Sequence, residues 1–307
     1  MNLIVDMNPY LKREYEVEKF IKNKDLDAIS SDISIEGMAK EILKLHDILG
    51  AKYGYLTLLG GESGFLYENI LKESVENIEI VKTKDEIREL IKINAEEDFL
   101  KVFTKRPRIT MEEEQEFYST YMEKIDDAEI TIINDDLKEK EDSEKLKNLS
   151  NISYKKGKKI AIVPNSGNIE EIIDSNPFLI ILDKNTLESY LNCELDFEWE
   201  INKAINSILN KKASEIIFIN NKDEISLYKS SGIQRAIFKK ENKFELDKTR
   251  AITGYSIGIE KNYDKEMCLQ VALACGKLSA EDLKEKTDAS RIKELMKFIE
   301  IERYNAV

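Results

Sequence analysis

The sequence predicts an α/β fold: a three-layer α/β/α arrangement around a mostly parallel sheet, with a small separate β-sheet attached to it. Short apolar strands are expected at 128–133, 159–163, 178–182 and 215–219, and helical patterns lie between them at 169–174, 185–192 and 200–211. Apolar strands that alternate with helices are typical of a parallel sheet buried on both faces.

The first part of the chain predicts strands at 1–7, 13–20, 53–59, 78–81, 86–93 and 99–103. Several alternate between apolar and polar residues, which indicates a sheet with one wet face. Helices are expected at 37–49, with Gly50 as the C-terminal cap, at 64–71, and from Thr110 with its capping-box sequence. We expect one domain over 1–307, with the small sheet formed by roughly 9–35 and 78–109, a segment called the lid sheet below.

The last part of the chain predicts a strand at 223–228, a strand-like run at 244–246, and helices at 264–274, 280–289 and 291–302. The segment 248–261 lies between that strand-like run and an apolar, helix-spaced pattern. A strand, a loop and a helix start form a common phosphate site, because unpaired backbone N–H groups and the helix dipole favour an anion. Here, however, the glycines come late, at Gly254 and Gly258.

Composition narrows the function classes. The 307 residues carry a formal net charge of −13, which argues against nucleic acid or an anionic membrane as the main partner. No apolar run reaches the roughly 18 residues of a membrane span, and the start does not resemble a signal peptide. Three cysteines without a Cys-x-x-Cys pair predict reduced core thiols of a cytoplasmic protein. The single histidine, His46, is expected to be an ordinary helix residue.

Several short runs, taken in order, carry a resemblance to a known family. They are Asn-Pro at 8–9 followed by Tyr-Glu-Val at 15–17, Leu-Gly-Gly at 59–61, Arg88 with Lys92-Ile93, Pro107 to Thr110, and Pro-Phe-Leu-Ile at 177–180. Together they resemble the ribokinase-like (PfkB) sugar kinases, in the branch that contains 1-phosphofructokinase and tagatose-6-phosphate kinase. The resemblance implies the ribokinase-like fold, ATP-dependent phosphorylation of a sugar phosphate with Mg-ATP as the cofactor, and often a dimer formed by paired lids.

The resemblance also implies where the site residues fall. The sugar-binding positions are Lys12, Gly37, Met38, Glu41 and Arg88, and the nucleotide-binding positions are Asn221, Asp223, Arg250, Ala251, Ile252 and Gly254. The Gly-Ala-Gly-Asp signature falls on 250–253, so Thr253 stands at the position of the catalytic base. The metal-linked Asn-x-x-Glu motif falls on 183–186, with Thr186 in place of Glu. No metal ligands are therefore predicted.

A threonine hydroxyl cannot act as a base near neutral pH, and side chains at Arg250 and Ile252 obstruct a close backbone approach to phosphate. We therefore expect a catalytically inactive pseudokinase, acting as a homodimeric or heteromeric assembly module or as a sensor that binds a sugar phosphate or nucleotide. The alternative is an active phosphotransferase that uses a fructose or tagatose phosphate with rearranged ligands.

Three interpretations stay open. Lys248 and Arg250 either hold an anion at a helix start or are solvated surface charges, and we favour the second. Arg88 either holds a sugar phosphate or forms a cross-strand charge pair. Gly60 and Gly61 either approach a ligand or form a tight strand-to-helix turn, and we favour the turn.

Overall fold

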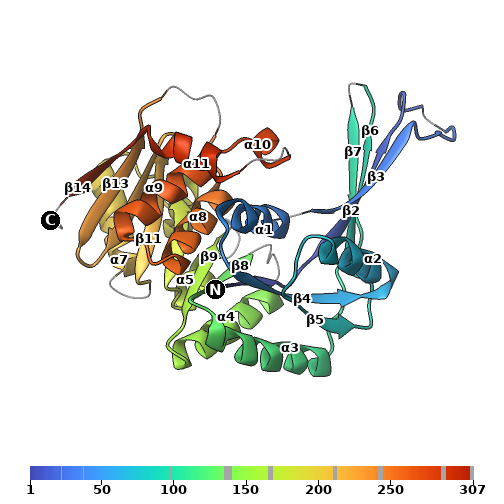
Figure 1. Cartoon of the computed structure of the whole chain (residues 1–307), viewed down its shortest axis with the longest axis horizontal. Helices are drawn as coiled ribbons and strands as arrows, with labels where there is room; N and C mark the ends of the chain where they lie inside the picture. Colours follow the sequence, from blue (N-terminus) through green and yellow to red (C-terminus); the bar gives the residue numbers. More distant parts are fainter. Residues whose placement is uncertain are drawn as a thin grey trace. The chain divides into compact units, whose positions relative to one another are not determined.

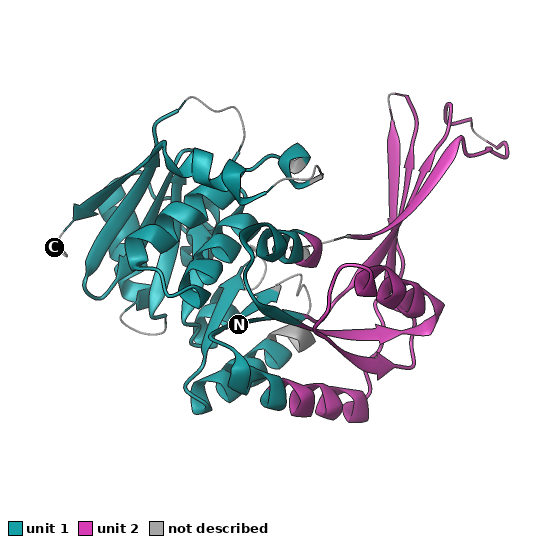
Figure 2. Ribbon diagram, viewed as in Figure 1, with its two compact units in different colours: residues 1–5, 41–54, 122–307 teal, residues 6–40, 55–121 magenta. Residues whose placement is uncertain are grey.

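The computed structural model describes residues 1–21, 23–36, 38–96, 98–134, 140–164, 169–209, 213–240, 245–284 and 288–304. The chain divides into two compact units (Figures 1 and 2). Unit 1 contains residues 1–5, 41–54 and 122–307, and unit 2 contains residues 6–40 and 55–121. The expectation of a single domain stays a prediction.

The main sheet of unit 1 is parallel on one side and antiparallel on the other. Its strand order is β14 (Ile299–Tyr304), β13 (Gly232–Phe238), β12 (Glu224–Lys229), β11 (Glu215–Asn221), β10 (Leu179–Asp183), β9 (Lys159–Val163), β8 (Ile130–Asn134) and β1 (Asn2–Asp6). The five strands from β1 to β11 pair in parallel, and β11 to β14 pair antiparallel. The parallel strands are almost completely buried, as their apolar sequences predict.

Helices cover both faces of this sheet. The helices in this part of the chain are α1 (Met38–Leu49), α4 (Lys140–Lys155), α5 (Ile169–Asp174), α6 (Lys184–Leu191), α7 (Glu198–Leu209), α8 (Lys248–Glu260), α9 (Lys265–Gly276), α10 (Ala280–Lys284) and α11 (Ala289–Met296). Helix α8 is buried from Thr249 to Ile259 and packs beside α9 against the sheet (Figure 1). Helix α7 packs on the opposite face, since α9 and α7 contact alternating residues of β13, Gln234 and Arg235 respectively.

Unit 2 contains a parallel strand pair and a separate four-stranded sheet. Strands β4 (Tyr53–Gly60) and β5 (Ile78–Thr83) pair in parallel and are accompanied by α2 (Gly61–Lys72) and α3 (Met111–Lys124). The four-stranded sheet has the order β3 (Ser30–Glu36), β2 (Tyr10–Glu16), β6 (Arg88–Asn94) and β7 (Phe99–Phe103). This is the small second sheet that the alternating strands predict.

Several expected elements differ from the structure. The expected helix at 291–302 is wrong, because α11 ends at Met296 and the chain continues as β14. The expected strand-like run at 244–246 is wrong for 245–246, which are not in a strand, and Phe244 lies outside the described residues. Strands β3 and β13 were not expected, and β5 pairs with β4 although its residues fall in the predicted lid segment.

Two of the three cysteines and the C-terminal cap of α1 agree with the predictions from the sequence. Cys268 and Cys275 are buried thiols, whereas Cys193 is exposed, which corrects its expected place in the core. Gly50 has φ of 58° directly after α1, as the predicted cap requires. Among the described residues, no helix is both long and apolar enough to cross a membrane.

His46 is a fully buried residue of α1, consistent with its expected structural role. Its ring lies between the backbone carbonyl of Ile42, 2.7 Å from Nδ1, and the amide nitrogen of Asn2, 3.0 Å from Nε2. Burial disfavours the charged imidazolium and lowers the pKa of His46 from 6.5 to about 4, against the smaller effect of the Ile42 carbonyl. The ring is therefore neutral in the folded protein at physiological pH.

This burial predicts a pH-dependent stability. Because the unfolded chain takes up a proton on His46 near pH 6.5 and the folded chain does so only near pH 4, stability falls as the pH falls through that window. Between pH 7 and pH 5, the free energy of unfolding in urea should decrease by about 2 kcal/mol from this residue. His46→Gln should remove this part of the pH dependence, and an unchanged pH profile in the variant would contradict the assignment.

Candidate functional site

The start of α8 is capped by a carboxylate of the chain itself. Asp247 is the N-cap residue, and its Oδ1 accepts a hydrogen bond from the backbone N–H of Arg250 at 2.8 Å. An N-cap aspartate satisfies one of the unpaired donors of a helix start and places a negative charge at the positive end of the dipole. A phosphate bound at a helix start would accept hydrogen bonds from the same backbone N–H groups.

Because α8 begins at Lys248, residues 250–253 are not a loop before a helix. They form the first two turns of α8, which corrects the expected position of the phosphate loop. Thr253, at the position implied for the base, is completely buried, and its hydroxyl donates to the carbonyl of Thr249 at 2.6 Å. Ala251 and Ile252 are completely buried as well. None of these three side chains reaches solvent.

Arg250 makes the central contact of the site, with Glu41 of α1. Its Nε lies 3.0 Å from Glu41 Oε2 and its Nη2 lies 2.8 Å from Glu41 Oε1, while Nη1 donates to the carbonyl of Leu278 at 2.5 Å. This two-pronged geometry is the strongest form of a guanidinium–carboxylate pair. The Arg250 side chain is only 10% exposed, so the expectation of a solvated surface charge is wrong.

The electrostatic surroundings of Arg250 favour its charge. Burial works against the charged form, but the Glu41 carboxylate, with smaller contributions from Asp247 and Asp282, outweighs it and raises the pKa of Arg250. Glu41 stands at a position implied to bind sugar, and Arg250 stands at one implied to bind nucleotide. The structure thus brings together two predicted site residues, and they bind each other.

Lys248 is bound in a similar way, which also corrects its expected role as a solvated charge. Its Nζ lies 2.5 Å from Asp183 Oδ2 and 3.3 Å from the hydroxyl of Thr186. Asp183 caps the start of α6 through the backbone N–H of Thr186. Burial raises the pKa of Asp183, but Lys248 and Thr186 outweigh burial, so the pKa is lowered and the carboxylate stays charged.

The glycines of α8 contribute to helix packing. A Cβ on Gly254 would lie 2.8 Å from the carbonyl of Val271 in α9, and one on Gly258 would lie 2.8 Å from Cys268 Sγ. Separations this short are closer than packed atoms allow, so only glycine permits this approach of the two helices. Gly254, expected to bind nucleotide, therefore lies at a helix–helix contact.

The expected nucleotide loop is the tight turn of the β11–β12 hairpin. The backbone N–H of Asp223 donates to Asn221 Oδ1 at 2.8 Å within this turn. Asp223 Oδ1 lies 2.7 Å from Nζ of Lys277, whose side chain is fully buried and which also donates to the carbonyl of Lys222 at 2.9 Å. Sequence reasoning missed Lys277, because nothing about a lysine after an apolar helix indicates such a contact.

In unit 2, two of the implied sugar-binding residues, Lys12 and Arg88, lie on the four-stranded sheet. Lys12 Nζ forms an ion pair with Glu14 Oε2 at 2.7 Å. The guanidinium of Arg88 lies over the ring of Phe103, with Cζ 4.2 Å from the ring centroid, and its Nε donates to the carbonyl of Thr104. This cation–π contact differs from the expected cross-strand charge pair, and the sugar-phosphate role of Arg88 stays a prediction. Gly37 lies outside the described residues, and Met38 is the first residue of α1.

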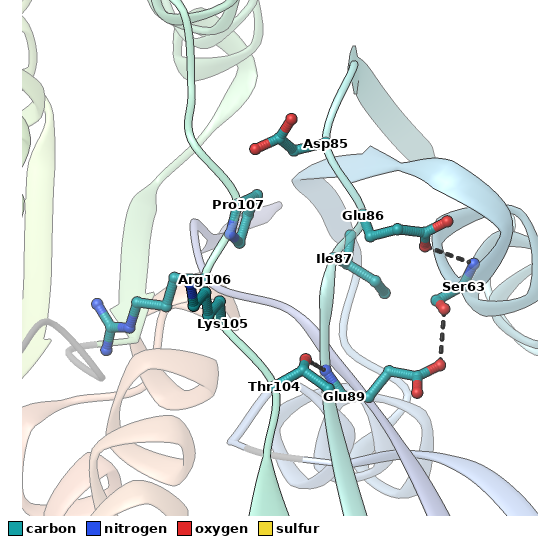
Figure 3. Close-up of a pocket in the computed structure, with 9 residues that line it drawn as sticks. All are labelled: Ser63, Asp85, Glu86, Ile87, Glu89, Thr104, Lys105, Arg106 and Pro107. Atoms are coloured by element: carbon teal, nitrogen blue, oxygen red, sulfur yellow. Dashed lines mark hydrogen bonds between the residues drawn. The ribbon is translucent and has the colours of Figure 1, made fainter.

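A second helix start, that of α2, also receives a carboxylate of the chain. Glu86 accepts hydrogen bonds from the backbone N–H groups of Glu62 and Ser63 at 2.7 and 3.0 Å, and the hydroxyl of Ser63 donates to Glu89 at 2.7 Å (Figure 3). Gly61 has φ of 69°, and a Cβ there would collide with the Glu86 carboxylate. Gly61 therefore serves both expected roles: it forms the tight turn, and it allows an anion to approach closely. The anion is the Glu86 carboxylate of the chain itself.

These groups border an open cavity of unit 2 with a volume of about 430 Å³. It is lined by Ser63, Asp85, Glu86, Ile87, Glu89, Thr104, Lys105, Arg106 and Pro107 (Figure 3). The backbone N–H groups of Glu62 and Ser63 contact Glu86, and the backbone N–H of Arg108 contacts Asp85 at 2.9 Å. Among the described residues, no cluster of histidine, cysteine and carboxylate side chains has a metal-binding arrangement.

No family model matches the chain, and no curated protein sequence matches it. Solved structures do match it over its length. A putative phosphofructokinase from Staphylococcus aureus is 17% identical, with all of both chains covered and a TM-score of 0.88. The tetrameric inhibited form of phosphofructokinase-2 from Escherichia coli is 14% identical, with 97% of this chain and 98% of that chain covered and a TM-score of 0.78.

A possible 1-phosphofructokinase from Thermotoga maritima is 17% identical, with 99% of each chain covered and a TM-score of 0.76. The chain therefore has the ribokinase-like fold of phosphofructokinase-type sugar kinases, which confirms the fold that the sequence runs indicate. At these identities the likeness establishes the fold and not the chemistry.

The Arg250–Glu41 pair predicts a strong energetic coupling. Glu41→Gln leaves a buried guanidinium without its counter-charge and should destabilise the protein by about 3 kcal/mol, whereas Arg250→Met leaves Glu41, which is 31% exposed, and should cost less. The double variant should be more stable than the sum of the two single losses predicts, as measured by urea unfolding in a double-mutant cycle. Strictly additive losses would show that the two side chains do not interact in solution.

Proposed function

We propose that the chain is a catalytically inactive relative of the sugar-phosphate kinases whose fold it shares, and that it serves as a binding or assembly module. One observation carries the proposal: the side chain at the implied phosphate-loop position, Arg250, is bound by the side chain at an implied sugar position, Glu41. In a kinase, both places face ligands. Here the two side chains form an ion pair with each other.

The charges around the start of α8 argue against a phosphoryl group there. Glu41, Asp247 and Asp282 all act on Arg250, so its one positive charge is surrounded by carboxylates. A phosphate arriving at this helix start would have to displace Glu41 or lie beside like charges, which is unfavourable in a partly buried site. Lys248, the other cation of the first turn, is held by Asp183.

The chemistry would also lack its usual groups. A general base contributes typically about 10²–10⁴-fold to a rate, and each backbone donor for an oxyanion on the order of 10²–10³-fold. Thr253 is buried inside α8, and the first-turn N–H of Arg250 is already bound to Asp247. Phosphoryl transfer depends mainly on positioning and electrostatic stabilisation, and both would be weakened together.

One observation favours the alternative, an active ATP-dependent phosphotransferase acting on a fructose or tagatose phosphate. Asp247 is a carboxylate at the start of α8, close to where a base for phosphoryl transfer would be needed. It would have to leave Arg250 N–H and accept a proton from a sugar hydroxyl. Asp247→Asn tests this, because asparagine caps a helix as well as aspartate but cannot act as the base.

We therefore predict that millimolar Mg-ATP produces no ADP with fructose 1-phosphate, fructose 6-phosphate or tagatose 6-phosphate in a coupled assay. Thermal melting with the same compounds separates a module that binds ligand from one that does not, because a ligand specific for the native state raises stability by RT ln(1 + [L]/Kd). A shift without turnover supports a ligand-binding module. Turnover that Asp247→Asn abolishes would overturn the proposal and establish the alternative.

We also propose that the chain forms a homodimer through the four-stranded sheet of unit 2. On one face of this sheet the strand register brings together Ile33, Ile91, Ile93, Leu100 and Val102. Ile91 and Ile93 of β6 adjoin Val102 and Leu100 of β7, and Leu100 and Val102 are 44–49% exposed, which is unusual for neighbouring aliphatic side chains. Ile33, which is 41% exposed, lies on the same face on the other side of Arg13 of β2. A second copy of the same face would cover them, and one solved structure with this fold is described as tetrameric.

The dimer is testable with exposed residues alone. Leu100→Asp and Val102→Lys should convert a dimer to a monomer in analytical ultracentrifugation, because each places a charge among the exposed aliphatic side chains of this face. Their melting temperatures at low protein concentration should stay close to that of the unmodified chain, since both side chains are exposed in the monomer. A wild-type chain that sediments as a monomer at micromolar concentration would contradict the proposal.

A further inference from the structure

The strand β14 forms one edge of the main sheet of unit 1. It pairs antiparallel with β13 from Ile299 to Tyr304, and in the described part of the chain no strand pairs with its other side (Figure 1). An open edge presents a row of backbone donors and acceptors that can accept another strand. Side chains on an edge strand commonly prevent unwanted strand pairing. The side chains of β14 therefore indicate which kind of strand could pair with it.

The side chains of β14 that face α7 are acidic and aromatic. Arg235 of β13 lies opposite Glu302 and stacks on Tyr304, and its guanidinium lies 2.6 Å from Glu198 at the start of α7. Because side chains alternate along a strand, Glu300 shares this face with Glu302 and Tyr304. This face therefore has Glu300, Glu302 and Tyr304 along the open edge.

The start of α7 adjoins the same surface through Glu198, whose carboxylate contacts Arg235. Glu198 is flanked by Phe197 and Trp199, and both aromatic side chains are 61% exposed. Tyr304 is 43% exposed. Exposed tryptophan and tyrosine side chains are enriched at the energetic centres of interfaces, and Trp199 is the only tryptophan of the chain. We call the set of Phe197, Glu198, Trp199 and the α7-facing residues of β14 the edge surface.

A second copy of β14 does not fit this edge. Two-fold related antiparallel strands place opposite one another residues that share a face of the sheet. Two such registers pair most of β14. One places Glu300 of each copy opposite Glu302 of the other, and the second places the two Glu302 side chains opposite each other. Like charges directly opposite destabilise a strand pair. The acidic residues therefore disfavour pairing of β14 with a second copy of itself.

The same surface already shows how it holds a guanidinium. Arg235 is bound by the carboxylate of Glu198 at 2.6 Å and that of Glu224 at 3.0 Å, and lies 4.9 Å from the centroid of the Tyr304 ring. Glu300 makes one ion pair, with Lys239 at 3.3 Å, in which both side chains are 46% exposed or more. Such an exposed pair is weak and exchanges readily with another cation.

We propose that the edge surface docks an extended, basic segment of a partner protein, which adds to the sheet as a strand beside β14. Lysine or arginine side chains at alternate positions of the segment lie opposite Glu300 and Glu302. Backbone hydrogen bonds to the edge provide affinity, and the alternating charges fix the register. The net charge of −13 speeds the encounter with such a partner.

The probe is a short fluorescent peptide in which lysine alternates with valine, titrated with the full chain and followed by anisotropy and by the emission of Trp199. We expect saturable binding with a change in Trp199 emission. Glu300→Lys combined with Glu302→Lys should weaken binding by about tenfold, and should let the matching glutamate–valine peptide bind instead. Glu112→Lys with Glu116→Lys, on the exposed face of α3, is the control of equal charge change.

Strand addition is distinguished from simple charge attraction by a peptide that is N-methylated at alternate backbone amides, which keeps the lysines but removes the edge hydrogen bonds. This peptide should lose binding. Equal binding of the methylated peptide, equal weakening by the two double-lysine variants, or no binding of the lysine–valine peptide would each overturn the proposal. These outcomes do not depend on whether the chain has kinase activity.

Discussion

The close packing of α8 against α9 is the constraint on which the site depends. Only glycines at 254 and 258 allow the two helices this separation, and α8 is buried along almost its whole length as a result. A helix fixed in this way has a fixed first turn. Lys248 and Arg250 are therefore held at the α8 start, where each is bound by a carboxylate from another element, Asp183 of β10 and Glu41 of α1.

A common principle links the helix starts of the two units. Asp247 at α8, Asp183 at α6 and Glu86 at α2 each supply the negative charge that a helix start favours. In proteins that bind phosphate at such places, the ligand supplies that charge. Supplying it from the chain stabilises the free protein and removes the advantage that an arriving anion would have. Without a ligand, the positive end of the helix dipole is therefore already paired with a carboxylate at each of these three helix starts.

The sequence predicts the fold well because the apolar strands and the helix caps are local signals. It fails where two periodicities overlap: residues 289–304 contain a helical pattern at Ile292 and Leu295, and then a strand alternation from Ile299 onward. The site was harder to predict. Counting from a resemblance placed a loop at 250–253, whereas the cap at Asp247 starts the helix earlier. The partners of Arg250 and Lys277 are 209 and 54 residues away, and no local pattern encodes such contacts.

On the proposal of an inactive relative of the kinases, the Arg250–Glu41 pair would also make a phosphate site at the α8 start difficult to restore in single steps. Replacing Arg250 by glycine would leave the Glu41 carboxylate next to the place that a phosphate has to occupy, where like charges repel. Replacing Glu41 by asparagine would leave a buried guanidinium without its counter-charge, which is costly for stability. Each residue is thus required by the presence of the other. Under this proposal, coupling of this kind makes the ion pair a stable alternative to a ligand site.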